Sequence, residues 1–395
     1  MAVRVLHIIT RLIVGGAQEN TLLTVEGLHR RPEYEVALMV GKDDGPEGDI
    51  LARARTGGFP LIEVPEMVRS LHPIDDVVAL AKITRAIRRG RYDIVHTHST
   101  KAGLLGRIAA RLAGTPLVVH TLHSLVFHRY QPRLLNLGLR LMKRGLAPTT
   151  DYFISVSDAV RDGAIAAGIG RRDRYATVYS GMELDVFLEG GKNRAEVRRR
   201  FGIDDDTVVV GKVARLFHLK GHAQLLPALP ALVRAVPNVK VLLVGDGILK
   251  DRIAADAVRL GVADHIVFAG LVPPEQVPDY IGAMDVVVHT SLREGLARVI
   301  PQALAMGKPV VAFALDGSPE VVRPGVSGYL VEPEDTDGLA RALIALCRDG
   351  HEREQMGKNG RALVDPMFRA ETMVEDVHVI YQRLLAERGT AHRAR

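Results

Sequence analysis

Cysteine and tryptophan are almost absent from this sequence. The single cysteine is Cys347, which excludes an intramolecular disulfide and a cysteine-based zinc site and fits a reducing compartment. Long apolar runs are also missing, because no stretch approaches the roughly 18 uncharged apolar residues of a membrane-spanning helix. The apolar N-terminal segment is too short and too interrupted for a signal peptide. We therefore expect a cytoplasmic protein, whose contact with a membrane would be peripheral, at the inner face.

The chain carries little excess charge and few aromatic residues. Lys and Arg number 52 and Asp and Glu 46, which gives a net charge of +6, and aromatic residues make up 5%. This modest positive balance suits anionic ligands or a membrane surface. Basic runs interleaved with aromatic residues are lacking, so nucleic acid is not an expected partner. The 395 residues, 47% of them apolar, suffice for two or three globular domains.

Short β-branched runs recur throughout and alternate with helical patterns, which predicts parallel sheets and an α/β fold. They form two series of about six, so we expect two similarly built Rossmann-like domains. The first series is Val3–Ile9, Glu35–Val40, Leu61–Val64, Asp93–His98, Leu117–Thr121 and Tyr152–Val156. The second is Val208–Ala214, Val239–Val244, Ile266–Phe268, Val286–His289, Pro309–Phe313 and Gly328–Val331.

The domain boundaries follow from the break between these series. Residues 181–206 contain turn residues and charge blocks that indicate a linker or a surface helix. We place the first domain at 1–187, the second at 188–366 and a C-terminal helix and tail at 367–395. The last stretch has one apolar stripe at helical spacing, and its helix either packs on the second domain or reaches back to the first.

Two segments suit phosphate binding. The first strand leads into Gly15-Gly16, where a helix start leaves free backbone N–H groups for an anion; the alternative is a plain glycine turn. The spacing of a dinucleotide fingerprint is lacking. Arg215 and Lys220 follow a strand of the second domain, at the sheet edge where α/β proteins bind ligands, and suit a diphosphate. The alternative is an ordinary solvated loop.

Histidines cluster after two consecutive strands of the first domain, at His96, His98, His120, His123 and His128. Zinc is disfavoured, because no acidic partner lies at ligand spacing and we interpret His96 and His98 as pointing to opposite faces of a strand. A polar sugar-binding or proton-handling site is more economical. We expect His96 and His120 to be packed core residues.

Acidic residues are mostly explained by local structure. Asp204–Asp206 precede a strand instead of ending one, so a turn is favoured over a metal-binding motif; Asp43-Asp44 and Asp75-Asp76 indicate turns or helix starts. Glu294 differs, because it follows the strand Val286–His289 and precedes a helix. Pro301 is compatible with that helix if it begins near Ala297 or Arg298.

In this order and spacing, these motifs resemble family 4 of the retaining, nucleotide-sugar-dependent glycosyltransferases, with the GT-B architecture of two Rossmann-like domains facing a central cleft. The resemblance covers nearly the whole chain. Its markers are Gly15–Gln18, Asp93–Gly103, His120–His123, Val156–Asp158, Val178–Phe187, Val213–Gly221 and Glu294–Val310.

The resemblance implies roles for individual residues. The Gly16 backbone, Arg215 and Lys220 would hold the donor diphosphate. His123 and Glu294 would be the catalytic pair, with His123 near the leaving-group oxygen and Glu294 on the donor sugar hydroxyls.

Further roles concern the nucleotide and the acceptor. Gly270 and Leu271 would meet the base, Gln302 the ribose, and His98 and Lys101 would lie on the acceptor side. The reaction of such enzymes resembles a front-face displacement and needs no catalytic metal. The only small-molecule partner that the resemblance implies is therefore the nucleotide sugar.

Two departures from the family pattern concern the donor site. Gln302 replaces the expected glutamate, and Ala297 replaces the usual proline. An amide still bonds ribose hydroxyls but loses a charge-assisted bond, at a cost of about 1 kcal/mol. On the acceptor side, Arg133, Asn136, Arg140, Lys143 and Arg144 share a helical face that suits anionic lipids; the alternative is a normal amphipathic surface helix.

The sequence thus predicts a hexosyltransferase that moves a sugar from a nucleotide diphosphate, with UDP favoured, to a polysaccharide or lipid-linked acceptor of the cell envelope, including lipopolysaccharide. One rival is a sugar-nucleotide epimerase of the same architecture. The other is a non-catalytic nucleotide-sugar-binding protein, which Gln302 motivates.

Overall fold

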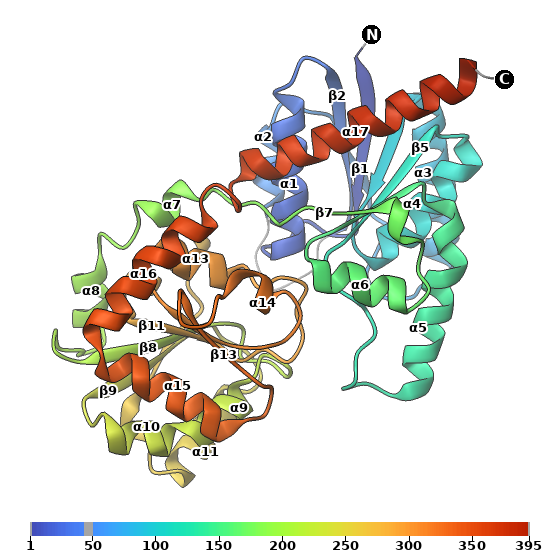
Figure 1. The fold of residues 1–395 in the computed structure, drawn as a ribbon. Helices are drawn as coiled ribbons and strands as arrows, with labels where there is room; N and C mark the ends of the chain where they lie inside the picture. Colours follow the sequence, from blue (N-terminus) through green and yellow to red (C-terminus); the bar gives the residue numbers. More distant parts are fainter. Residues whose placement is uncertain (1, 43–49, 394–395) are drawn as a thin grey trace. The chain divides into compact units, whose positions relative to one another are not determined.

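The computed structural model describes residues 2–42 and 50–393 (Figure 1); the predicted turn at Asp43 and Asp44 lies outside them. The chain forms two compact units. Unit 1 comprises Met1–Met182 and Arg369–Arg395, and unit 2 comprises Glu183–Phe368. The predicted boundaries, at residues 187 and 366, fall close to this division.

Unit 1 is built on a seven-stranded parallel sheet with the order β3-β2-β1-β4-β5-β6-β7. The sequence predicted all but the shortest strand, β7. The strands are β1 (Val3–Ile9), β2 (Tyr34–Gly41), β3 (Leu61–Val64), β4 (Ile94–Thr97), β5 (Leu117–Leu122), β6 (Tyr152–Ser155) and β7 (Tyr175–Thr177). The strand order reverses between β1 and β4, the position where Rossmann-like sheets open a crevice for ligands.

Two layers of helices cover the sheet of unit 1. The helices are α1 (Gly16–His29), α2 (Leu51–Thr56), α3 (Pro73–Gly90), α4 (Thr100–Ala113), α5 (Arg133–Leu146) and α6 (Asp158–Ala166), together with α17 (Ala370–Arg393) from the end of the chain. Val5 and Ile9 of β1 face the core formed with α1 and α17, whereas Leu6 and Ile8 face the core formed with α3 and α4. Asp75 and Asp76 lie in the first turn of α3, as predicted.

The C-terminal helix α17 belongs to unit 1, which settles the alternative that the sequence left open. Its apolar stripe, including Met373, Val377 and Tyr381, is buried in the same core as β1, and Figure 1 shows the helix in red beside α1. The backbone of Ala370 donates to the Met182 carbonyl at 3.0 Å. Residues 369–393 are therefore an integral layer of unit 1.

Unit 2 contains a six-stranded parallel sheet with the order β10-β9-β8-β11-β12-β13. Its strands are β8 (Val208–Val213), β9 (Val239–Val244), β10 (Ile266–Gly270), β11 (Val286–His289), β12 (Val310–Phe313) and β13 (Gly328–Val331). Its helices are α7 (Asp185–Leu188), α8 (Arg194–Arg200), α9 (His222–Leu225), α10 (Leu229–Ala235), α11 (Lys250–Arg259), α12 (Val277–Ala283), α13 (Val299–Ala305), α14 (Ser318–Val321), α15 (Thr336–Arg348) and α16 (Gly350–Val364). The order reverses between β8 and β11, which again marks a ligand crevice.

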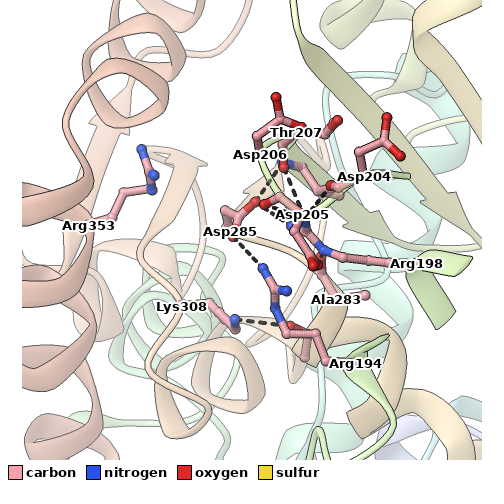
Figure 2. Close-up of polar contacts among 12 residues, drawn as sticks. Arg194, Arg198, Asp204, Asp205, Asp206, Thr207, Ala283, Asp285, Lys308 and Arg353 are labelled. Atoms are coloured by element: carbon pink, nitrogen blue, oxygen red, sulfur yellow. Dashed lines mark hydrogen bonds and ion pairs between the residues drawn. The ribbon is translucent and has the colours of Figure 1, made fainter. Parts of the chain in front are cut away.

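The segment predicted as a linker or surface helix is part of folded unit 2. Arg198 of α8 is 1% exposed. It donates to Asp285 Oδ2 at 2.7 Å and to the carbonyls of Asp204 and Thr207, each at 3.0 Å (Figure 2). A buried guanidinium is tolerated only with such partners. Asp204–Asp206 thus form a turn whose main chain binds Arg198, which confirms the turn over the metal-binding motif.

Candidate active site

The loop between β8 and α9, residues 214–221, carries the predicted phosphate-binding cations of unit 2. The Leu216 N–H donates to the Asp246 carbonyl at 2.9 Å, and the Leu219 carbonyl accepts from Leu292 at 2.8 Å. Gly221 has φ 75°, and a Cβ there would lie 1.6 Å from the Thr290 carbonyl oxygen. Glycine is therefore required, and it holds the loop against the segment that follows β11.

Lys220 and Glu294 meet at the carboxyl edge of this sheet. The Lys220 ammonium lies 2.5 Å from Glu294 Oε1 and each side chain is about one-quarter exposed. The Glu294 N–H donates to Asp316 Oδ2 at 2.6 Å. Three loops, which follow β8, β11 and β12, thus converge on one charged centre, and the structure brings together two residues that the sequence assigned to the donor.

The pKa values of the two carboxyls shift in opposite directions. Burial raises the pKa of Glu294, but the Lys220 charge and hydrogen bond outweigh it and leave that pKa below its usual value. Burial raises the pKa of Asp316. Glu294 is therefore an anion at neutral pH, able to accept hydrogen bonds from sugar hydroxyls, while Lys220 remains close enough to serve a phosphate.

Sequence reasoning missed a buried polar group beneath this pair. Lys212 is 1% exposed and donates to Thr290 Oγ1 at 2.9 Å. Burial, reinforced by the Lys220 charge, lowers its pKa to about 7. Burial likewise lowers the pKa of His289 to about 3. The available signal was a lysine inside the otherwise apolar run Val208–Val213, since lysine is almost never fully buried without a partner.

The remaining predicted donor residues lie around the same edge of unit 2. The Arg215 guanidinium stacks on the Phe217 ring, 5.0 Å from its centroid. Gly270, at the end of β10, has φ 76°, and Leu271 beside it is 71% exposed. Gln302 is half-buried in α13, which begins just after Arg298 as Pro301 required.

In unit 1, helix α1 begins at Gly16, and Gly15 precedes it in an extended conformation. The first N–H groups of a helix have no intrahelical partners. Since α1 follows β1 at the carboxyl edge of the sheet, these N–H groups lie where the sequence prediction requires them for binding an anion.

The histidines of unit 1 are closer together than the sequence prediction allowed. Ring centroids of His96 and His98 lie 4.4 Å apart, so the prediction that they point to opposite faces is wrong. Residues two apart on a strand share a face. The sequence analysis also missed His7 of β1, which pairs across the sheet with His96. His96 and His120 are both 1% exposed, as expected of packed core residues.

His123 lies at the end of this cluster and is partly exposed. Its Nε2 is 3.1 Å from His98 Nδ1. Burial lowers the pKa of His123 to about 4, so the ring is neutral near pH 7 and can both donate and accept a hydrogen bond. The predicted catalytic histidine is thus joined to the predicted acceptor-side residue His98.

Lys101 has a structural partner. It is 6% exposed in α4, and its ammonium lies 2.5 and 2.6 Å from the two carboxylate oxygens of Asp76 in α3. This buried ion pair ties α3 to α4, a role that the sequence did not anticipate.

Helix α5 exposes leucines as well as arginines. Leu134 is 84%, Leu137 52% and Leu141 55% exposed, whereas Lys143 is 4% exposed. Asn136 also turns inward and accepts from the His128 N–H at 3.0 Å. The prediction of a five-residue polar face is therefore wrong, because the side chains of Asn136 and Lys143 turn inward. Arg133, Arg140 and Arg144 remain exposed beside the leucines.

Comparison with known proteins identifies the family. A family model described as glycosyl transferases group 1 matches residues 193–363, and a glycosyl transferase 4-like domain matches residues 15–181. The chain therefore belongs to the family 4 glycosyltransferases of GT-B type, and the predicted family and enzyme class are confirmed.

Individual relatives cover most of the chain. A GDP-mannose-dependent alpha-(1-6)-phosphatidylinositol monomannoside mannosyltransferase of Mycolicibacterium smegmatis is 32% identical over 83% of this chain and 85% of that protein. A UDP-Gal:alpha-D-GlcNAc-diphosphoundecaprenol alpha-1,3-galactosyltransferase of Escherichia coli is 26% identical over 96% of each. The crystal structure of Anabaena Alr3699/HepE with UDP-glucose superposes with a TM-score of 0.81 at 24% identity, over 96% of this chain and 99% of that one. Across the described ranges, we find no helix with the length and apolar character needed to cross a membrane.

Proposed function

We propose that this glycosyltransferase moves a hexose from a nucleotide diphosphate, with UDP favoured, to a lipid-linked or polysaccharide acceptor of the cell envelope, with retention of configuration. The observation that carries the proposal is the Lys220–Glu294 pair at the carboxyl edge of the unit 2 sheet. A cation for phosphate and a carboxylate for sugar hydroxyls, side by side, are what a sugar diphosphate requires. The names of the galactosyltransferase and mannosyltransferase relatives both include a lipid-linked acceptor.

Each donor residue has a role in this proposal. Lys220, Arg215 and the N–H groups at Gly16 neutralise the diphosphate, so no metal ion or other cofactor is needed for that purpose. Glu294 orients the sugar, Gln302 the ribose, and the exposed backbone at Gly270-Leu271 meets the base. Gly270 suits that approach because no atom lies within 4 Å of a Cβ placed on it.

The transfer step is a front-face displacement. The bond between the anomeric carbon and the leaving phosphate oxygen breaks, and a bond to the acceptor oxygen forms on the same face of the sugar. The proton of the acceptor hydroxyl passes to the departing phosphate. His123 supports the reaction as a neutral hydrogen-bonding group near the leaving oxygen, with His98 behind it.

Helix α5 is our candidate for the membrane contact, because Leu134, Leu137 and Leu141 form an exposed apolar stripe with arginines beside it. Apolar side chains flanked by cations bind the interface of anionic bilayers. We therefore place the protein at the cytoplasmic face of a membrane, where a lipid-linked acceptor is available. We also assign Lys101 to the acceptor side. Its role there is to stabilise α4 through the ion pair with Asp76.

Calorimetric titration with UDP, GDP and UDP-sugars tests the donor site. Removal of either cation, by Lys220→Ala or Arg215→Ala, should weaken nucleotide diphosphate binding by about 1.5–3 kcal/mol, as for charge-assisted hydrogen bonds. Lys240→Ala is the matched control, since Lys240 lies near the amino end of β9 and bonds the Asp264 carbonyl. Unchanged affinity in both test variants would refute this donor site.

A further inference from the structure

A continuous row of hydrogen bonds leads from the interior of unit 1 to His123. Its links are Thr121 Oγ1 to His96 Nε2 (2.7 Å), His96 Nδ1 to the Tyr381 hydroxyl (2.6 Å), that hydroxyl to His7 Nε2 (3.4 Å), His7 Nδ1 to His98 Nε2 (3.0 Å) and His98 Nδ1 to His123 Nε2 (3.1 Å). We call these six residues the histidine relay. They come from β1, β4, β5 and their ends, and from α17.

All four imidazoles of the histidine relay are neutral. Burial lowers the pKa of His7 to about 3 and that of His123 to about 4. Burial, with the neighbouring histidines, also lowers the pKa of His96 and His98 well below the usual value. Near pH 7 each ring therefore carries one N–H, and one ring nitrogen remains an acceptor.

Proton counting leaves three consistent arrangements. Six neutral members carry six relay protons, one on each imidazole and hydroxyl, and five links use five of them. If every member donates toward His123, the sixth proton lies on His123 Nδ1. If every member donates toward Thr121, His123 carries its proton on Nε2, and the spare proton is on the Thr121 hydroxyl. If both halves of the row donate toward Tyr381, whose hydroxyl oxygen can accept two hydrogen bonds, His123 again carries its proton on Nε2, and the spare proton is on the Tyr381 hydroxyl.

The two buried hydroxyls decide between these arrangements. Thr121 is 4% exposed, and among the described residues its hydroxyl has only His96 as a hydrogen-bond partner. When Thr121 accepts from His96, its own buried proton has no acceptor, and the same holds for Tyr381, which is 0% exposed, when it accepts from both His96 and His7. An unpaired buried donor is costly, and both hydroxyl protons are paired only when every member donates toward His123. The arrangement that points toward His123 is therefore the stable one.

We propose that the histidine relay fixes the tautomer of His123, with the proton on Nδ1, and that Tyr381 is the positioning residue that transmits this choice across the sheet. His123 then presents a fixed N–H donor at the ring nitrogen that His98 does not occupy. The further step, that this N–H group bonds to an oxygen of the nucleotide sugar, rests on the proposed function. The C-terminal helix thereby supplies a functional group as well as a packing surface.

A metal ion is the competing use of these histidines. Ligand atoms of His7, His96 and His98 lie within 4.8 Å of one another. Zinc would need a bare nitrogen from each ring at about 2.0–2.1 Å. Both nitrogens of His96 and both of His7 are instead within hydrogen-bonding distance of relay partners, so the hydrogen-bonded arrangement fits the geometry better.

The tautomer can be measured without substrate, by NMR of the full-length protein labelled with 15N in its histidines. Protonated and bare ring nitrogens have well-separated 15N shifts, and His123→Asn assigns the His123 signals. We expect His123 with its proton on Nδ1 at pH 7.5. In Tyr381→Phe, which cuts the relay between His96 and His7, we expect a mixture of both tautomers.

Tyr34→Phe is the matched control. Tyr34 also fastens α17, through His378 at 2.8 Å and Gln382 at 3.2 Å, but it is outside the relay. It should leave the His123 tautomer unchanged. A wild-type His123 protonated on Nε2, or an unchanged tautomer in Tyr381→Phe, would overturn the proposal. So would histidine shifts that change when the protein is dialysed against EDTA, since these would indicate a bound metal.

Activity provides a separate readout. Once a donor and an acceptor are found, Tyr381→Phe should lower kcat about twofold if both tautomers become equally populated, and more if the Nε2 form dominates. Nucleotide affinity should not change. If the tautomer shifts and kcat does not, the relay stands but His123 has no role as a donor in transfer. The NMR measurement therefore tests the tautomer independently of the proposed function.

Discussion

Buried ionisable side chains gather at the carboxyl edges of both sheets. In unit 2 they are Lys212 and His289, beneath the Lys220–Glu294 pair. In unit 1 they are the histidines of the relay. Burial drives each of these groups toward its neutral form. A neutral group at the end of a parallel strand donates or accepts hydrogen bonds without the cost of a buried charge, and this suits the hydroxyl-rich ligands of glycosyltransferases.

Gln302 is the residue whose effect on the donor is easiest to isolate. If it binds the ribose, Gln302→Ala should weaken donor binding by about 0.5–1.5 kcal/mol, the value of one neutral hydrogen bond. Gln302→Glu should tighten binding or leave it unchanged, because a carboxylate makes the stronger acceptor. Calorimetry on the three proteins makes the comparison. Equal affinity in all three would show that Gln302 is structural.

The lowered pKa values of the relay histidines predict how the free energy of unfolding changes in acid. His7 has a pKa of about 3 in the folded protein and about 6.5 in an unfolded chain. Between these values the unfolded state binds the proton and the folded state does not. His7 therefore contributes stability that is complete above pH 6.5 and is lost as the pH falls, at about 1.4 kcal/mol per pH unit.

The measurement is hydrogen exchange of the slowest amides of β1 and β4 between pH 6.5 and pH 4.5. In His7→Gln the decline of the unfolding free energy with falling pH should be shallower than in the wild type. Identical slopes would mean that His7 is protonated in the folded protein.

At the scale of elements, the strands were the best predicted part of the fold. β1, β3, β9, β11 and β13 have the bounds expected from the sequence. For the inner strands β9 and β11 the reason is burial on both faces, which makes such strands nearly continuous apolar runs. β7 was missed, since three residues with the sequence Tyr-Ala-Thr carry no periodic signal. The segment containing α8 was predicted to be a linker or a surface helix because its arginines look solvated, and only tertiary structure reveals the partners of Arg198.

The site was less predictable than the strands. Motifs indicated Lys220, Glu294, His98 and His123, but sequence order does not show which side chains meet. Lys212 and His289 lie inside or at the end of strands and appear in no motif. His7 and Tyr381 lie hundreds of residues apart along the chain, and only the packing of α17 on β1 brings them together.

The exposed leucines of helix α5 predict that the protein binds anionic membranes through this helix. A variant in which Leu134, Leu137 and Leu141 are all serine should bind anionic vesicles at least about a hundredfold more weakly, since each lost leucine contact costs about 1 kcal/mol or more. Leu112→Ser, at a 55% exposed leucine of α4, is the control. Vesicle sedimentation measures both. Equal binding of the triple variant and the wild type would remove α5 from the acceptor side.

At the scale of the whole molecule, two Rossmann-like units provide complementary groups. Unit 2 contains the charged pair that we assign to a sugar diphosphate, and unit 1 contains the neutral histidines and the helix start at Gly16. The C-terminal helix α17 belongs to unit 1, so that unit is built from two segments that are separated along the chain by the whole of unit 2.

Metal independence is a property of the whole reaction. We expect full activity in excess EDTA, because the proposed function assigns the stabilisation of the leaving diphosphate to Arg215, Lys220 and the Gly16 N–H groups. The control is the same assay with added magnesium or manganese. Complete loss in EDTA that either metal restores would contradict the donor site described above.

The most direct test of the account is a transfer assay with a radiolabelled UDP-hexose, with and without a diphosphoundecaprenol-linked sugar as acceptor. We predict labelled acceptor with an α-linkage and release of UDP, dependent on both substrates and reduced in Lys220→Ala but not in Lys240→Ala. Conversion of the UDP-hexose to its epimer without acceptor, or binding of the donor with no transfer to any lipid-linked or polysaccharide acceptor, would contradict it.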